Sequence, residues 1–429
     1  MPHPTYHSTR SAAEALPFAE ALIRGLAPDG GLYIPNIIPG LSATGWATAD
    51  DFTTLAQRVL RAWLSDEVPA DVLDPLVEDA LNFQVPLVSL SEKWEGIHVL
   101  ELFHGPTLSF KDFGARMMAR WMGHFLHQRG EQRTILVATS GDTGSAVADG
   151  FAGIDGIDVV LLYPKGKVSP TQERQLIVER PNVRTFAVDG VFDDCQRMVK
   201  AAFVDPDLAD AGLSSANSIN IGRLLPQMLY YIWSINMLGP ATICVPSGNL
   251  GNLTGGLFAQ TGGVPIRQFV AAHNANDFFP DYLAADPDAA FAPTVATVSN
   301  AMDVGAPSNF ERLDTLFGPE QLRERILGHA VADDKTLTTM QSLAEETGYV
   351  ACPHTAVGLA AVQRLRGAGA IEAPIVVLAT AHPAKFPEVV EQATGARPAV
   401  PPALAELATR PTRVTTIAPT LDALKGVLV

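Results

Sequence analysis

Lys111 is the residue whose surroundings most directly suggest chemistry. It lies in the segment LELFHGPTLSFKDFGARMMARWMGHF (residues 100–125), between two phenylalanines and just ahead of apolar residues at helical spacing. Apolar surroundings favour the neutral amine, which is the form that attacks a carbonyl to make an imine. A lysine near a helix start is also commonly a solvated surface group, and Asp112 beside it could be a simple salt partner.

A glycine-rich loop is the second candidate, in CVPSGNLGNLTGG (residues 244–256). Gly248 and Gly251 let the backbone turn tightly and expose N–H groups, and the helix expected beyond adds its positive end, so the loop suits a phosphate. It carries no lysine and is therefore not a nucleotide P-loop, nor does it match GxGxxG. A plain tight turn between strand and helix is the alternative.

A third loop, ATSGDTGSA (residues 138–146), has the same strand-turn-helix context. It offers hydroxyls and one carboxylate from Thr139, Ser140, Asp142 and Thr143. Two candidate anion loops together with a sheltered lysine indicate a cofactor phosphate and a second, anionic substrate group.

The elements that must position these residues alternate between short apolar strands and helices. We expect strands at residues 134–139, 157–164, 183–190, 241–247, 266–274 and 373–383. Continuous apolar strands that alternate with helices are typical of a mostly parallel sheet covered on both faces, so the fold class is α/β. The first ~90 residues differ and are helix-rich.

Composition excludes several classes of protein. The chain has 429 residues, 47% of them hydrophobic, and a net charge of −16, which argues against a nucleic-acid partner. Residues 224–266 carry no charge, but proline, asparagine and glycine interrupt them, so we expect a buried helix and strand rather than a membrane span. Cys195, Cys244 and Cys352 have no metal-binding spacing. We therefore expect no bound metal. The N-terminal residues contain no apolar run like that of a signal peptide, so we expect a cytoplasmic protein.

Several motifs, in this order along the chain, resemble the threonine synthase family, in its longer bacterial and fungal branch. They are STR and GGLYIP near the N-terminus, FHGPTLSFKDFG, ATSGDTGSA, NSINIGRLLPQ, VPSGNLGNLTGG and TAHPAKFPE. The resemblance extends from about residue 6 to about residue 393. It implies a fold type II pyridoxal-phosphate (PLP) enzyme, similar to tryptophan synthase β, with two mostly parallel sheet lobes flanked by helices.

The resemblance also implies roles for individual residues. Lys111 would hold PLP as a Schiff base, and Thr380 would hydrogen-bond the pyridine nitrogen. The cofactor phosphate would lie on Gly248, Asn249, Leu250, Gly251 and Asn252. The substrate O-phospho-L-homoserine would place its carboxylate on the loop of Thr139, Ser140, Asp142 and Thr143. We assign its phosphate to Ser218, Asn220 and Arg223, since an arginine fork binds phosphate well, with Lys385 and Arg116 as weaker candidates.

The implied reaction converts O-phospho-L-homoserine and water to L-threonine and phosphate. Two alternatives stay open: another fold type II lyase, such as a dehydratase or amino-phospholyase, and a catalytically inactive phospho-ligand binding protein. We expect an N-terminal helix-rich domain (residues 1–95), a catalytic domain (96–393, with a smaller mobile lobe near 130–215) and a tail (394–429). The sequence does not distinguish a monomer from a homodimer.

Overall fold

A six-stranded sheet forms the larger lobe of the protein. The computed structural model describes residues 3–139 and 141–428. The strand order is β11-β10-β9-β12-β4-β3, and every neighbouring pair is parallel except β3 with β4. The strands are β3 (Leu87–Ser89), β4 (Ile97–Glu101), β9 (Thr242–Pro246), β10 (Gln268–His273), β11 (Ile326–Ala330) and β12 (Ile375–Ala379). Ile375 of β12 is in register with both Ile97 and Thr242, so β4, β12 and β9 end at one edge.

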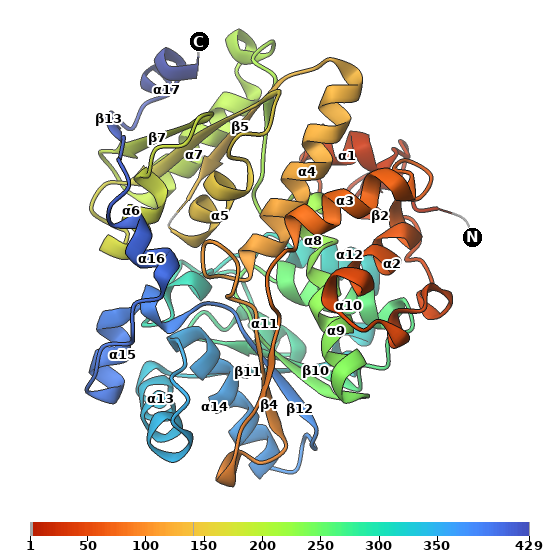
Figure 1. The fold of residues 1–429 in the computed structure, drawn as a ribbon, viewed down its shortest axis with the longest axis vertical. Coiled ribbons are helices and arrows are strands. Elements are labelled where there is room, and N and C mark those ends of the chain that lie inside the picture. Colours follow the sequence, from red (N-terminus) through yellow and green to blue (C-terminus); the bar gives the residue numbers. More distant parts are fainter. Residues whose placement is uncertain (1–2, 140, 429) are drawn as a thin grey trace.

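A second, five-stranded parallel sheet forms the smaller lobe (Figure 1). Its order is β13 (Thr415–Ile417), β7 (Val183–Val188), β6 (Ile157–Pro164), β5 (Arg133–Ala138) and β8 (Leu213–Ser214). Ile135 and Val137 of β5 belong to one hydrophobic cluster, and Leu136 and Ala138 to another. Both faces of the strand are therefore buried, which explains its uninterrupted apolar sequence and confirms the predicted fold class.

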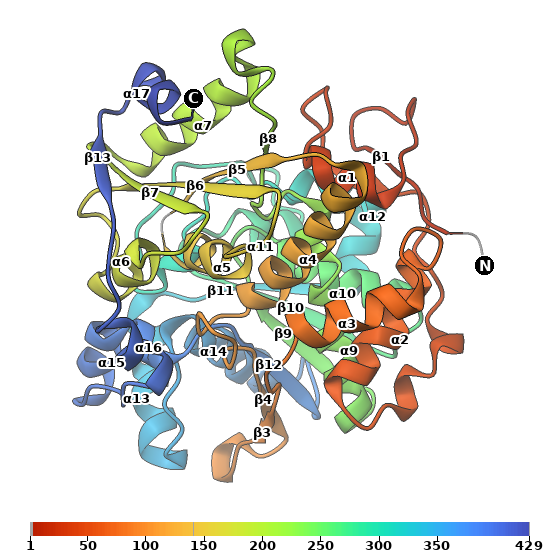
Figure 2. The same ribbon diagram turned by 45° about the horizontal axis from the view of Figure 1, so that its top comes forward.

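The helices cover both sheets and build the N-terminal region. Figures 1 and 2 show α1 to α3 gathered beside α4, α9 and α10, and α1 also meets the edge of the smaller sheet, where Ser214 of β8 donates to the carbonyl of Ile23. The helices are α1 (Phe18–Arg24), α2 (Phe52–Leu64), α3 (Ala70–Ala80), α4 (Lys111–Arg129), α5 (Asp142–Gly150), α6 (Pro170–Ile177), α7 (Phe192–Val204), α8 (Ile221–Leu224), α9 (Gln227–Leu238), α10 (Gly251–Thr261), α11 (Phe278–Leu283), α12 (Phe310–Arg325), α13 (Asp333–Thr347), α14 (Pro353–Gly367), α15 (Pro387–Thr394), α16 (Pro402–Leu407) and α17 (Leu421–Leu428). A two-stranded antiparallel sheet, β1 (Tyr6–Ser8) with β2 (Tyr33–Pro35), and short 3-10 helices such as η5 (Asn300–Met302) and η6 (Pro383–Lys385) complete the fold.

The uncharged stretch from residue 224 to residue 266 contains α9, β9 and α10, as predicted. Most of α9 is buried, including Tyr230 and Tyr231. Among the described residues, no helix is both long and apolar enough to cross a membrane.

The C-terminal residues return from the larger lobe to the smaller one. They run along one side of the molecule in Figure 1, where β13 pairs with β7 and α17 lies beside α7. Leu424 of α17 is fully buried in the smaller lobe. The predicted domain boundaries at residues 95 and 393 stay a prediction.

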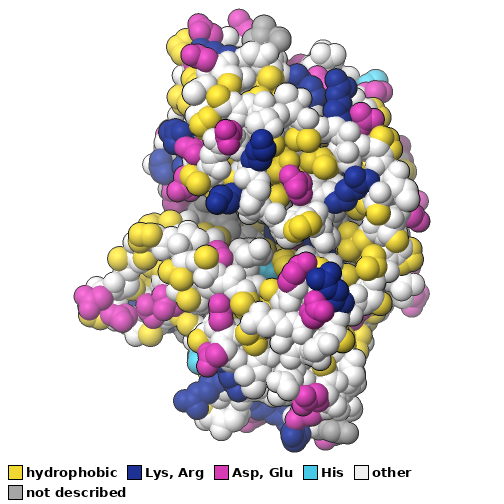
Figure 3. Space-filling view, turned by 90° about the vertical axis from the view of Figure 1, so that its left-hand side faces the viewer, with side chains coloured by type: hydrophobic (Ala, Val, Ile, Leu, Met, Phe, Trp, Pro, Cys, Tyr) yellow, Lys and Arg dark blue, Asp and Glu magenta, His cyan; other side chains and the backbone are white. Residues whose placement is uncertain are grey.

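On the face drawn in Figure 3, basic side chains are scattered among acidic ones.

Candidate active site

The segment before Lys111 pairs with the residues that follow β12. The N–H of Phe110 donates to the carbonyl of Thr380 at 2.9 Å, and the N–H of His382 donates to the carbonyl of Leu108 at 3.1 Å. Leu108 has a left-handed backbone (φ 60°), which bends the chain back toward α4. These contacts bring Lys111 and Thr380, far apart in sequence, to the same edge of the larger sheet.

Lys111 is the first residue of α4, and its Nζ atom lies 5.6 Å from the centre of the Phe110 ring. Burial lowers the pKa of Lys111 below its usual value; Asp142 opposes this shift, while the positive charges of Lys385 and Arg223 add to it. The neutral amine is therefore favoured more than on an exposed lysine, as imine formation requires.

The loop between β9 and α10 presents a row of backbone donors. Leu250 has a left-handed backbone (φ 62°) immediately before α10 begins at Gly251. The N–H groups of residues 248–253 donate to no acceptor in the described part of the chain. Unpaired N–H groups at a helix N-terminus fit a phosphate, so this loop can hold the phosphate of PLP.

Two asparagines of this loop anchor it to neighbouring elements. Asn249 donates from Nδ2 to Ser218 Oγ at 2.6 Å and accepts from the N–H of Ser308 at 2.5 Å. Asn252 Oδ1 accepts from the hydroxyls of Tyr230 (2.6 Å) and Tyr231 (2.7 Å). Asn252 Nδ2 is buried and has no partner among the described residues, so it remains available to a ligand.

The loop before α5 uses its polar groups differently. Thr139 Oγ1 accepts from the N–H groups of Gly144 (2.8 Å) and Gly141 (3.1 Å), which shapes the turn. Ser140, predicted to contact substrate, lies outside the described residues. Thr143 is half-buried in the first turn of α5.

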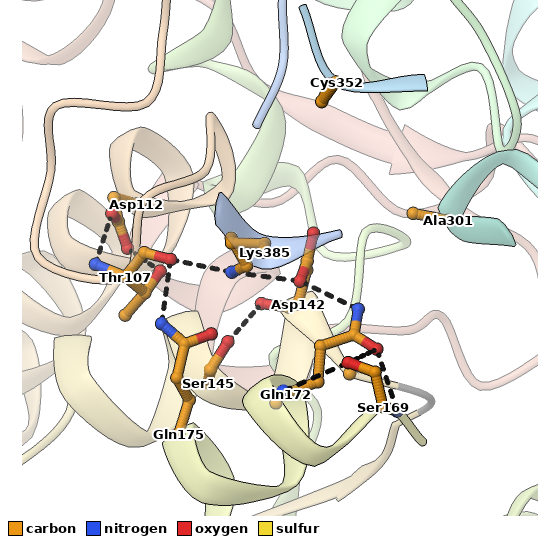
Figure 4. Close-up of polar contacts among 12 residues, drawn as sticks. Thr107, Asp112, Asp142, Ser145, Ser169, Gln172, Gln175, Ala301, Cys352 and Lys385 are labelled. Atoms are coloured by element: carbon orange, nitrogen blue, oxygen red, sulfur yellow. Dashed lines mark hydrogen bonds and ion pairs between the residues drawn. The ribbon is translucent and has the colours of Figure 1, made fainter. Parts of the chain in front are cut away.

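Asp142 forms the buried ion pair drawn in Figure 4. Its Oδ1 lies 3.0 Å from Lys385 Nζ and accepts from Gln172 Nε2 at 3.1 Å. Burial by itself would raise the pKa of Asp142, but Lys385, Lys111 and the hydrogen bonds lower it well below its usual range. The carboxylate is therefore charged and already paired.

The predicted phosphate-binding residues on and before α8 have different tasks. Asn220 caps α8 by accepting from the N–H of Gly222 and donates to the carbonyls of Leu22 and Ser215, so its amide is fully engaged. Arg223 donates from Nη1 to the carbonyl of Ala216 at 2.6 Å, but its buried Nε has no partner in the part described. Burial lowers the pKa of Arg223 to about 10, so it stays positive at neutral pH.

Arg223 also lies close to the start of α4. A Cβ added to Gly114, one turn after Lys111, would lie 2.7 Å from the Arg223 carbonyl oxygen and 3.0 Å from its Nε. This approach requires glycine and places the guanidinium near Lys111. Arg116, by contrast, donates to the carbonyls of Ala80 and Asp79 and serves the end of α3.

Sequence reasoning missed several polar residues at the site. Thr107 donates from its N–H and its hydroxyl to Asp112, at 2.9 and 2.5 Å, and its carbonyl accepts from Gln175 at 3.1 Å. His354, at the start of α14, accepts from the N–H of Ala301 at 3.1 Å, and burial lowers its pKa to about 4. No spacing in the sequence marks these residues, because Gln175 reaches Thr107, and Ala301 reaches His354, from distant parts of the chain.

This arrangement defines a class of enzyme. The two parallel lobes, the buried lysine and the N–H cradle are those of a fold type II PLP-dependent enzyme, and residues 82–381 match the family model of pyridoxal-phosphate dependent enzymes. Residues 5–81 match the threonine synthase N terminus and residues 355–428 the threonine synthase C-terminal model. The chain belongs to the threonine synthase family.

Known relatives agree along nearly the whole chain. The chain is 44% identical to threonine synthase of Serratia marcescens, with 91% of each chain covered, and 42% identical to that of Escherichia coli, with 93% covered. Its fold is similar to PLP-bound threonine synthase of Brucella melitensis (TM-score 0.92, 36% identity, 99% and 98% covered) and to the E. coli enzyme (TM-score 0.89, 40% identity, 99% of each covered). These similarities confirm the predicted fold class, cofactor and family.

Proposed function

We propose that the protein converts O-phospho-L-homoserine and water to L-threonine and phosphate. The observation that carries the proposal is the meeting of Lys111, the N–H cradle of residues 248–253 and the unpartnered Nε of Arg223 in one buried region. Two separate anion receptors beside one lysine suit a cofactor phosphate and a substrate phosphate. Membership of the threonine synthase family supports the same reaction.

The residues of this chain divide the work of holding the cofactor. Lys111 would bind its aldehyde carbon, the loop of Gly248 to Asn252 its phosphate, and the Thr380 hydroxyl its ring nitrogen. When bound, PLP supplies an electron sink for negative charge that develops on the substrate. The Lys111 amine, when free, would take the proton from the substrate Cα, because its lowered pKa favours the neutral form that can act as a base.

The substrate anions would have separate receptors. The loop of Thr139, Ser140, Asp142 and Thr143 would hold the carboxylate, largely through backbone N–H groups, because the Thr139 hydroxyl is engaged in the turn. Ser218 and Arg223 would hold the phosphate, whereas Asn220 would position them by capping α8.

The test is an end-point assay of purified protein with PLP and O-phospho-L-homoserine that measures threonine and phosphate together. Equal amounts of both products support the proposal. Phosphate with a keto acid and no threonine would indicate the elimination alternative. Lys111→Ala should abolish both turnover and the visible absorbance of bound PLP, and normal activity of this variant would refute the role of Lys111.

We also propose a cytoplasmic location and a small-molecule substrate rather than a nucleic acid. Cys195, Cys244 and Cys352 are unpaired and buried, as is usual in a reducing compartment. The net charge of −16 opposes a polyanionic partner. Fractionation of the source cells, with immunodetection of the protein, tests the location.

A further inference from the structure

Lys385 connects the two lobes at the candidate active site. It lies in η6, shortly after β12 of the larger sheet, and its side chain is completely buried. Figure 4 shows its Nζ between two oxygens, at 3.0 Å from Asp142 Oδ1 and 2.7 Å from the carbonyl oxygen of Thr107. Asp142 begins α5 of the smaller lobe, and Thr107 belongs to the turn that leads to Lys111.

Asp142 places a negative charge in the proposed substrate-binding loop, and Lys385 compensates this charge. A carboxylate in the loop proposed for the substrate carboxylate would repel that anion, and in a buried region the repulsion is strong. The same carboxylate favours the charged form of Lys111, which opposes the chemistry proposed for that amine. Removing one partner of a buried ion pair leaves the other charge uncompensated.

The contact also fixes geometry. The Thr107 carbonyl accepts from both Lys385 and Gln175, while Gln172 donates to Asp142. Gln172 and Gln175 both belong to α6, so one helix of the smaller lobe reaches both acceptors of Lys385. Lys385 therefore holds the turn before Lys111 at a set position relative to α5 and α6.

We propose that Lys385 is a positioning residue that neutralises Asp142 across the two lobes, so that the loop before α5 accepts an anionic substrate and Lys111 keeps a neutral amine. The part of the proposal that concerns the substrate rests on the proposed function. The part that concerns the charge of Lys111 does not, because Lys111 acts on the cofactor as well.

Four other titratable or charged groups of the described residues lie around this pair. Arg223 lies beside α4, His354 at the start of α14, His382 just before η6, and Asp112 next to Lys111. Burial keeps His354 neutral near pH 7. Among these groups, Lys385 is the one in direct contact with the Asp142 carboxylate.

The experiment compares Lys385→Met, Asp142→Asn and the double variant as PLP-loaded enzymes. The pH titration of the visible absorbance of bound PLP reports the charge near Lys111 without turnover. In Lys385→Met, where the unpaired carboxylate favours the protonated form, we expect the midpoint to rise by about one to three pH units. The KM for O-phospho-L-homoserine should rise about tenfold or more, because the unpaired Asp142 carboxylate repels the substrate anion.

The double variant is the decisive one. Adding Asp142→Asn to Lys385→Met should return the midpoint to within about half a pH unit of the starting enzyme and recover most of the KM, because neither charge then remains unpaired. A purely structural lysine would give a double variant at least as impaired as Lys385→Met, and that outcome overturns the proposal. So does an unchanged midpoint in a folded Lys385→Met enzyme.

Arg116→Met is the matched control. It removes another buried cation, one that pairs with Asp149 at 3.7 Å and serves the carbonyls of Ala80 and Asp79. Arg116 is not among the groups that shift the pKa of Lys111, so the midpoint should not move. A shift of equal size in this control would overturn the specific role of Lys385. If the wild-type enzyme forms no threonine, the proposed function fails, yet the absorbance titration still decides the coupling between Lys385 and Asp142.

Discussion

The contact between the cofactor-binding loop and η5 leads to a quantitative prediction for Gly248→Ala. A Cβ at residue 248 would lie 3.0 Å from Met302 Cα, 3.1 Å from its carbonyl oxygen and 3.3 Å from its carbonyl carbon. These are backbone atoms, so the new methyl group cannot be relieved by a side-chain rotation. Overpacking of this kind costs about 1–3 kcal/mol, which corresponds to a roughly 5- to 140-fold weaker affinity if the cradle for PLP absorbs it.

The assay is the dissociation constant of PLP, measured by fluorescence quenching after the enzyme has been stripped of cofactor. Gly251→Ala is the control in the same loop: its Cβ would meet Asn309 Nδ2 and Leu224 Cδ2 at 3.3 Å, and side-chain ends can shift. We expect the control to lose less than half as much binding free energy as Gly248→Ala. PLP affinity of Gly248→Ala equal to that of the wild type would refute the reasoning.

Three further predictions follow from other contacts. Arg223→Ala should raise KM about 10- to 150-fold, the value of one charge-assisted hydrogen bond of about 1.5–3 kcal/mol, with little change in PLP affinity by equilibrium dialysis. Loss of PLP would instead assign Arg223 to the cofactor site or the fold. Asn220→Ala should lower the free energy of unfolding in urea by about 1–3 kcal/mol, because a cap and two buried hydrogen bonds are lost; unchanged stability with a raised KM would point to direct substrate contact. Deletion of residues 414–429 should lower Tm and increase light scattering on heating, since it opens the edge of β7 and exposes α7; an unchanged Tm would contradict the structural role of this segment.

The sequence predicts the central strands of both sheets well because they are buried on both faces, but it does not predict β8 and β13 at the edges of the smaller sheet. The predicted ranges of β6 and β7 begin at the observed residues, and those of β9 and β12 contain the observed strands. It does not predict β4 and β11, whose sequences, IHVLE and ILGHA, mix apolar residues with histidine, glutamate or glycine. These strands are fixed by pairing with β12 and β10, which local sequence does not reveal.

The site residues also divide into those that a local sequence signal predicts and those that it does not. Lys111 and the loop of residues 248–252 carry local signals, an amine among aromatic rings and glycines between a strand and a helix. The partner of Asp142 carries none, because Lys385 is more than 240 residues away in the chain and reaches it only when the lobes pack together. Hydrogen bonding also distinguishes Arg223 from Asn220, although both are buried polar residues in one short motif. The Asn220 amide is fully engaged by the helix cap and two carbonyls, whereas the Arg223 guanidinium is partly free.

The strand order of the larger lobe has a consequence for folding while the chain is still being synthesised on the ribosome. β12 lies between β9 and β4, although it is made after both, so a nascent chain that ends before residue 380 lacks the strand that joins them. Lys111 follows β4 and the phosphate-binding loop follows β9, and β12 joins these two strands in one sheet. The complete edge, with Thr380 directly after β12, therefore forms only when translation is nearly complete, and a truncated chain released early lacks part of the site that would sequester PLP.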